Sequence, residues 1–316
     1  MASSSPMADG MTSAIGPSGG VPDEARFGEV YDRGYQHYLG ERLGRRAAYW
    51  ALITYSMKRA MGIKKSWTAK VIPFLLYLAV AGTVLVIIGI EAFLPDTVSA
   101  EVMSFSDYFN FIFLIEGAFV ATIAPEMLCG DRRERVLNLY FSRAITRLDY
   151  IVAKVLATAI LTTTIAVVPA VLLWLFRQLL ADKPISAITG NADQLGKIVV
   201  IGLAISLYLG TLGLMIASFT GRKSIAVAVI FISYGVLEGL IAGVREALDL
   251  NRTAHFLGFL SPALTSDNLA RYWLEPPTDF RGDFTGEFAW YWYLAAIVVS
   301  IAVAVLVMLW RYLPED

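Results

Sequence analysis

Residues 155–176 read VLATAILTTTIAVVPAVLLWLF, a stretch without a single charged side chain. A bilayer core about 30 Å thick is crossed by about 20 helical residues, so this stretch is long enough to span a membrane. Residues 198–221 and 288–310 form two more uncharged blocks of similar length. Of the 316 residues, 57% are hydrophobic and 17% are charged, whereas soluble proteins are about 45–50% apolar and about 25% charged. This composition excludes a secreted disulfide-rich protein, a disordered chain and a typical soluble enzyme.

Six segments are apolar and long enough to cross a bilayer. A helix satisfies its backbone hydrogen bonds internally, and an open strand in lipid does not, so we expect each segment to be helical. The expected spans are residues 71–94, 109–128, 150–176, 198–219, 224–243 and 290–309. The sequence therefore predicts an all-α polytopic membrane protein, and the even number of spans places both termini on one side.

The basic residues are distributed unequally between the two predicted sides. Nineteen of the 26 Lys and Arg residues fall on the side of the termini, ten of them in residues 26–70 and five between the second and third spans. Lys and Arg mark cytoplasmic loops, so we expect both termini in the cytoplasm. The net charge of −1 argues against a nucleic-acid partner, because such proteins carry a concentrated basic excess.

Four regions follow from composition along the chain. Residues 1–25 are rich in Ser, Gly, Pro and Ala and are expected to be a disordered cytoplasmic tail. Residues 26–70 contain an amphipathic pattern with many basic residues, which favours a helix lying in the membrane interface; the alternative is a solvated helix that packs on a partner. Residues 71–313 form the six-span domain, and residues 244–288 form an extracytoplasmic segment with short helices before the last span.

Motifs for catalysis are absent from the sequence. His37 and His255 fall on opposite predicted sides, and neither has a second ligand at metal-binding spacing. The chain contains no GxSxG motif and no Walker A motif, so it is not expected to hydrolyse nucleotides itself. The single cysteine, Cys129, excludes an intrachain disulfide. We therefore expect no catalytic residue, no metal site and no cofactor in this chain.

Residues 129–149, between the second and third spans, carry the strongest local signal. They begin with the charged run Asp131-Arg132-Arg133 and continue with apolar residues at helical spacing, namely Val136, Leu137, Tyr140 and Phe141. A short helix with an apolar face at a membrane surface needs a surface to dock on. That surface is either the inner ends of the protein's own helices or a partner protein.

This segment resembles the cytoplasmic segment of ABC transporter permeases of the type-2 export class. Members have a charged start, a leucine-rich middle, a Ser-Arg-x-x-x-Thr-Arg-x-x-Tyr-like run and a Lys in the next span. The corresponding residues here are Asp131 to Arg133, Val136 to Leu139, Ser142-Arg143, Thr146-Arg147, Tyr150 and Lys154. The proline that usually follows the Ser-Arg pair is Ala144 here. Residues 31–59 also resemble the leader of bacterial members, so the similarity covers most of residues 31–313.

The resemblance implies a mechanism. In this family the segment is a coupling helix that sits on a separate ATPase subunit, which binds ATP and Mg²⁺. The residues assigned to that contact are Asp131, Arg132, Arg133, Val136, Leu137 and Tyr140. The resemblance further implies two ATPase copies, a second permease copy or paralogue, a lipid environment in the bacterial cytoplasmic membrane, and ATP-driven export.

Four acidic residues fall within the predicted spans, and two of them, unlike Glu91 and Glu126, lie away from the membrane edges. Glu116 lies in the middle of the second span and Glu238 in the outer half of the fifth. A charge at a helix centre costs about 2.5–3.5 kcal/mol on insertion scales, so such residues usually face a cavity or a partner. Both are candidates for a polar patch in a substrate path. The alternative is a hydrogen-bonded carboxyl group that holds two helices together, which we favour for Glu238 and leave open for Glu116.

Small residues recur every four positions in two spans. One stripe is Gly202, Ser206 and Gly210, and the other is Gly235, Gly239 and Gly243. Small residues let helix backbones approach closely in a membrane. We favour packing within one subunit, with a contact between two copies as the alternative.

Two other functions remain open at this level. An ion- or proton-coupled secondary transporter needs ionisable residues along a path and often internal repeats; Glu116 fits weakly, and the halves show no clear repeat. A membrane scaffold would use its basic face to recruit partners without transport. The mostly apolar spans favour an amphipathic or lipid-like cargo over a highly charged one.

Overall fold

The computed structural model describes residues 44–63, 65, 67–93, 103–134, 136, 145–248, 258–275 and 288–312. Several predictions lie outside these residues: the tail of residues 1–25, the side chains of Leu137 and Tyr140, and large parts of the 244–288 segment. Glu238 lies on a described helix, but its side chain is not described. The described residues form α-helices, one short 3-10 helix and the turns between them.

Within the described ranges, six helices are long and apolar enough to cross a membrane. They are α2 (Thr68–Phe93), α4 (Phe105–Arg133), α6 (Arg147–Leu180), α8 (Ala192–Ser218), α9 (Lys223–Leu248) and α12 (Trp290–Tyr312). Each contains most of one predicted span. The predicted all-α fold with six membrane-spanning helices is therefore confirmed.

Two of the helices extend well beyond the predicted spans. Helix α4 has 29 residues and α6 has 34, which at 1.5 Å per residue gives about 44 and 51 Å, more than the bilayer core. Hydropathy locates only the apolar part of a helix, whereas capping decides where the helix begins. Helix α6 starts at a capping box, in which Thr146 and Asp149 each bond the other's backbone N–H.

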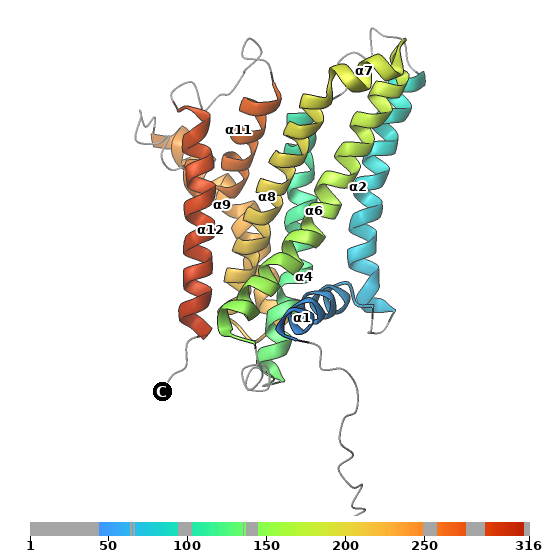
Figure 1. Ribbon diagram of the computed structural model, residues 1–316. Coiled ribbons are helices and arrows are strands. Elements are labelled where there is room, and N and C mark those ends of the chain that lie inside the picture. Colours follow the sequence, from blue (N-terminus) through green and yellow to red (C-terminus); the bar gives the residue numbers. More distant parts are fainter. Residues whose placement is uncertain are drawn as a thin grey trace, which may run out of the picture. The chain divides into compact units, whose positions relative to one another are not determined.

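Helices α4, α6 and α8 form the centre of the bundle, and α2, α9 and α12 lie around them (Figure 1). Helix α8 packs against α4, α6 and α12. Gly202 and Gly210 allow the close approach to α6, because a Cβ added at Gly202 would overlap Val167 and one at Gly210 would lie 3.1 Å from Thr158. The α8 stripe of small residues thus packs within the chain.

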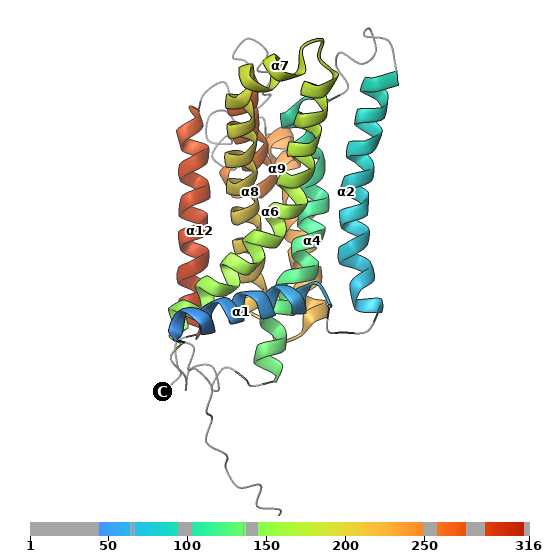
Figure 2. The ribbon, with the colours of Figure 1, turned by 45° about the vertical axis from the view of Figure 1, so that its right-hand side comes forward.

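Helix α1 (Arg45–Ala60) lies across one end of the bundle, where it crosses α6 and α4, and the last turns of α4 extend past it in Figures 1 and 2. We call this end the α1 end. It also holds the last turns of α4 and α12 and the first turn of α6; the Tyr150 and Tyr312 rings are 5.7 Å apart. A turn at Gly62, with φ +69, leads from α1 toward α2. A Cβ at Gly62 would lie 2.8 Å from the Ala69 carbonyl oxygen, so glycine suits this turn.

The opposite end carries shorter helices. Helix α7 (Pro184–Gly190) joins α6 to α8 (Figure 1). Within the 244–288 segment, η2 (Gly258–Leu260) and α11 (Pro262–Leu274) are described, and α11 packs against α4, α8 and α12. Arg271 of α11 pairs with Asp107 of α4 at 3.2 Å. Helix α11 is therefore tied to the bundle by charge as well as by apolar packing.

Candidate functional site

The candidate coupling segment leaves the last turn of α4 and enters the first turn of α6, and α1 crosses both helices at this point (Figure 2). The face of α1 toward the bundle is buried through Leu52, Ile53, Ser56 and Ala60. Trp50 and Tyr55 of α1 are exposed. Helix α1 therefore uses one face to join the ends of α4 and α6 and leaves an aromatic-bearing face open.

A buried ionic cluster joins the three helices. The side chain of Asp131, in α4, is fully buried and pairs with Arg59 of α1 at 2.6 Å and with Lys154 of α6 at 2.7 Å. The Tyr150 hydroxyl donates a hydrogen bond to Asp131 at 2.8 Å. The Lys154 ammonium group also donates to the Ser56 hydroxyl at 3.0 Å. We call these five residues, two from α1, one from α4 and two from α6, the Asp131 cluster.

The charges of this cluster balance once Glu134 is added to it. Arg59 makes a second ion pair, at 3.0 Å, with Glu134 at the end of α4, so two cations face two carboxylates. A buried ion pair is tolerated when its geometry is good and its remaining donors and acceptors are satisfied, and removing one partner is strongly destabilising. The cluster therefore holds the ends of α1, α4 and α6 in one arrangement.

A second link lies closer to solvent. The Arg45 guanidinium binds both carboxylate oxygens of Asp149, at 2.7 and 2.8 Å. Asp149 also belongs to the capping box that starts α6. Arg45 is largely exposed, so this pair adds less stability than the Asp131 cluster. It does connect the start of α1 directly to the end of the candidate coupling segment.

The residues predicted for coupling separate into two groups. Asp131 is buried, and Arg132 donates a hydrogen bond to the Ser218 carbonyl at the C-terminal end of α8, where a cation also suits the helix dipole. Arg133 instead leaves 67% of its side chain exposed, and Val136 is partly exposed. A role for Asp131 in coupling would therefore act through positioning, because its carboxylate has no access to a partner. The roles of all six residues stay predictions.

Glu116 lies inside the bundle, where it accepts a hydrogen bond at 2.7 Å from Ser206 of α8. Its other carboxylate oxygen, Oε2, is buried and has no hydrogen-bond partner among the described residues. The structure thus places Glu116 between α4 and α8, which fits a helix–helix contact, and leaves one acceptor open. The side chain of Glu238 lies outside the described part of the structure, so its predicted role stays a prediction.

Sequence reasoning missed a second ionic group at the α1 end. Glu126 of α4 pairs with Lys223 of α9 at 2.6 Å and also with Lys65, which follows α1. The partners lie 61 and 97 residues from Glu126 in the chain. No local pattern marks such a group, because its members meet only when three distant segments pack together.

The fold and these contacts define a class, namely an α-helical multi-pass membrane protein whose candidate coupling segment lies beside a buried cluster of ion pairs. The family model described as ABC-2 family transporter protein matches residues 91–316. The chain therefore belongs to the ABC-2 family of transporters and is an ABC transporter permease, a membrane component of transport, as the resemblance implied. A search of curated proteins finds no match.

Proposed function

We propose that this chain is the membrane-spanning subunit of an ATP-driven exporter whose ATP and Mg²⁺ are bound by a separate ATPase subunit. The observation that carries the proposal is the Asp131 cluster, which ties the helix entering the coupling segment to the helix leaving it and to α1. A displacement of the segment would then move α4, α6 and α1 together. Only a contact that differs between two conformations shifts the equilibrium between them. Because the Asp131 cluster holds these helix ends together, such a contact at the segment would also move the membrane-spanning helices.

The docking surface in this proposal consists of the exposed side chains near the end of α4. Arg133 leaves 67% of its side chain exposed, and Glu134 leaves 48% exposed although it pairs with Arg59. Val136 adds a partly exposed apolar side chain, and Leu137 and Tyr140 are proposed to extend the surface. Asp131 and Arg132 would position it from inside.

The charge distribution supports placing the α1 end in the cytoplasm of a bacterial cell. Arg59, Arg133, Lys154 and Lys223 all belong to this end, as do most of the Lys and Arg residues that the structure describes. Cytoplasmic loops carry the excess of Lys and Arg in membrane proteins. Both termini are then cytoplasmic, and the ATPase meets the coupling segment from the correct side.

A second permease copy or paralogue is part of the proposal. Gly235, Gly239 and Gly243 of α9 are exposed, and a Cβ added at any of them would meet no atom of the described residues within 4 Å. Unlike the stripe on α8, the α9 stripe is therefore not used for packing in the described part of this chain. Small-residue stripes of this kind support close approach of a helix from another subunit.

The cargo path is proposed to follow α4 and α9 toward α11. A pocket of about 280 Å³ lies there, lined mainly by apolar and aromatic side chains with a few polar groups. Its lining includes Phe109, Phe113 and Tyr234, and Asp267 of α11. Mixed walls of this kind suit an amphipathic cargo. Glu116 does not line this pocket, so its place on a path stays a prediction.

The test uses the chain copurified with its ATPase. We expect an affinity-tagged chain to bring down a chain with a Walker A motif, and the purified complex to hydrolyse ATP. Arg133→Glu combined with Leu137→Asp should weaken ATPase binding at least about tenfold, or ~1.4 kcal/mol. Arg46→Glu, a charge reversal on the exposed start of α1, is the matched control and should leave binding unchanged.

Two results would contradict the proposal. One is an intact, cargo-stimulated ATPase complex with the double variant. The other is transport in vesicles driven by a pH gradient without ATP, which would instead favour a proton-coupled secondary transporter. A chain that recruits proteins without transporting any cargo would point to a scaffold.

A further inference from the structure

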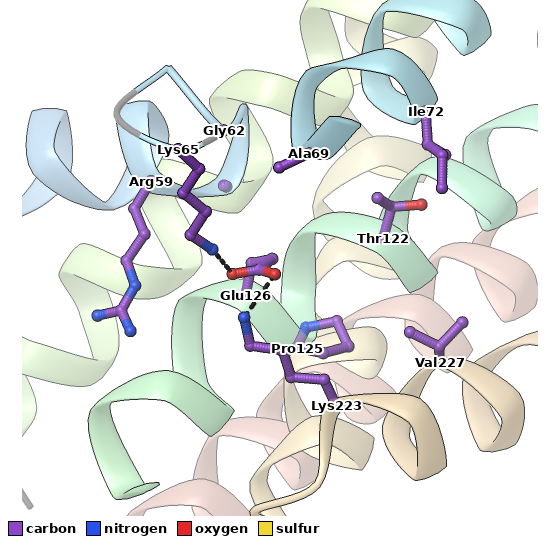
Figure 3. A pocket seen from close by; sticks show the side chains of 11 residues that line it. Arg59, Gly62, Lys65, Ala69, Ile72, Thr122, Pro125, Glu126, Lys223 and Val227 are labelled. Atoms are coloured by element: carbon purple, nitrogen blue, oxygen red, sulfur yellow. Dashed lines mark hydrogen bonds and ion pairs between the residues drawn. The ribbon is translucent and has the colours of Figure 1, made fainter. Parts of the chain in front are cut away.

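A pocket of about 220 Å³ opens at the α1 end around Glu126 (Figure 3). Its walls come from the turn after α1, from the first turns of α2 and α9, and from α4. This volume is well above the about 10–15 Å³ that a single water needs. We call it the Glu126 pocket; its lining residues are Arg59, Ala60, Gly62, Lys65, Ala69, Ile72, Thr122, Pro125, Glu126, Lys223 and Val227.

The pocket carries more positive than negative charge. Lys65 and Lys223 both point at the single carboxylate of Glu126 (Figure 3). Arg59, which also lines the pocket, is already paired with Asp131 and Glu134. One positive charge is therefore left over among the described lining residues. An anion between the two ammonium groups would balance it.

The two lysines are reachable from outside the protein. Lys65 keeps 32% of its side chain exposed and Lys223 keeps 31%. Burial lowers the pKa of Lys65, and Lys223 lowers it further, against the opposing effect of Glu126. A second anionic group beside Lys65 would stabilise its charged form.

The other side of the pocket is apolar and faces the membrane. In Figure 3, Ile72 of α2 and Val227 of α9 lie on the same side of Glu126, one above and one below the level of Thr122 of α4. Ile72 is 56% exposed and Val227 is 38% exposed, and both belong to membrane-spanning helices. A ligand in this pocket thus contacts cations at the end of the bundle. About one helical turn away, it also contacts apolar side chains that face the hydrocarbon.

We propose that the Glu126 pocket binds one anionic phospholipid, with its phosphate between Lys65 and Lys223 and an acyl chain along Ile72 and Val227. The charge of the pocket selects the headgroup, and its apolar wall selects a lipid over a free anion. The bound lipid would bridge the turn after α1 to α9. This proposal rests on the membrane-spanning fold and not on coupling to an ATPase, so each can fail without the other.

The experiment measures lipid binding to the full chain in detergent by native mass spectrometry and by the shift in Tm. The probes are phosphatidylglycerol, phosphatidylcholine and inorganic phosphate. We expect phosphatidylglycerol to bind and to raise Tm, and the other two to do so much more weakly. Equal effects of the two lipids, or a full effect of inorganic phosphate alone, would overturn the proposal.

Variants test the pocket itself. Lys65→Gln with Lys223→Gln should weaken phosphatidylglycerol binding about tenfold or more, because both cations that face the proposed phosphate are lost. Lys58→Gln with Lys70→Gln removes two charges near the same end but outside the pocket lining and is the matched control. Equal losses in the two double variants would overturn the proposal.

A variant that is expected to tighten lipid binding keeps the proposal testable even if the double lysine variant does not fold. Glu126→Gln removes the carboxylate that the lysines share and should tighten phosphatidylglycerol binding, whereas a purely structural role of Glu126 would not. Weaker or unchanged binding in a folded Glu126→Gln protein would contradict the proposed headgroup site.

Discussion

At the scale of single residues, Asp131 decides how the α1 end is held together. Its carboxylate is fully buried and meets one cation from α1, one cation from α6 and the Tyr150 hydroxyl. Such a group is stable only with its partners, because an unpaired buried charge is expensive. The proposed coupling segment therefore begins at a position where a single substitution has consequences in three helices.

Lys154→Met tests how far the buried Asp131 carboxylate depends on its cationic partners. The change leaves Asp131 with Arg59 and Tyr150 alone and removes the partner of Ser56. We expect a loss of about 3–5 kcal/mol of stability, measured as a lower Tm of the purified chain. Lys58→Met on the exposed face of α1 is the control. An equal Tm for the two variants would show that the cluster contributes nothing.

Gly130→Ala tests how Arg59 reaches Asp131. A Cβ at Gly130 would overlap the Arg59 guanidinium, which must then shift and disturb its ion pairs with Asp131 and Glu134. We expect destabilisation of about 1–3 kcal/mol. Gly89→Ala in α2, where an added Cβ meets nothing within 4 Å of the described atoms, should be harmless. Combining Gly130→Ala with Arg59→Ala should cost less than the sum of the two changes, since the overlap disappears.

At the scale of elements, close packing of α8 against α4 and α6 forms the bundle centre. Gly213 lies where α8 meets Val120 and Ala124 of α4, and Gly202 lies where it meets Val167 of α6. These contacts need residues without a side chain, because helix association in a membrane relies on van der Waals packing of close backbones. The position of α4, and with it that of the proposed coupling segment, depends on this contact.

Gly213→Ala should therefore move α4 relative to α8. The added Cβ would overlap the Val120 side chain, and we expect a loss of about 1–3 kcal/mol, read as a lower Tm. Gly196→Ala in the same helix meets no described atom within 4 Å and should be neutral or slightly stabilising. Val120→Ala should rescue the variant in part; failure of this rescue would place the cost elsewhere.

At the scale of the whole molecule, the described chain leaves α9 with a large membrane-facing surface. Only 25% of its most apolar window is buried, against 61% for α8. The three glycines of α9 lie on exposed positions. If a second copy covers them, the transport unit is a dimer, as proposed.

Cysteine cross-linking in native membranes tests this dimer. Gly235→Cys, Gly239→Cys and Gly243→Cys should give an oxidised dimer band at the position nearest the two-fold axis. Leu306→Cys on α12, which is 63% exposed, is the control and should stay monomeric. The native Cys129 is buried and should not contribute. No band at any of the three positions, with an active transporter, would contradict an α9 interface.

Much of the fold was predictable because the membrane imposes it. The most apolar parts of the six helices are between 22% and 67% buried in the described structure. Hydropathy therefore identifies a membrane-spanning helix whether or not other helices pack around it. Helix ends were less predictable: α6 begins at Arg147 and continues to Leu180, because its cap and backbone hydrogen bonds do not depend on the bilayer. Leu137 and Tyr140 stay predictions on residues that the structure does not describe.

The sequence by itself determined the number of spans, the helical class and the family, because each depends on local apolar length or on a contiguous motif. Tertiary structure alone decided that Asp131 faces inward and Arg133 outward, although the two are neighbours in one charged run. It also brought Lys65 and Lys223 onto Glu126 from segments far apart in the chain. Burial and charge pairing arise only when helices pack, so local sequence carries no signal for them.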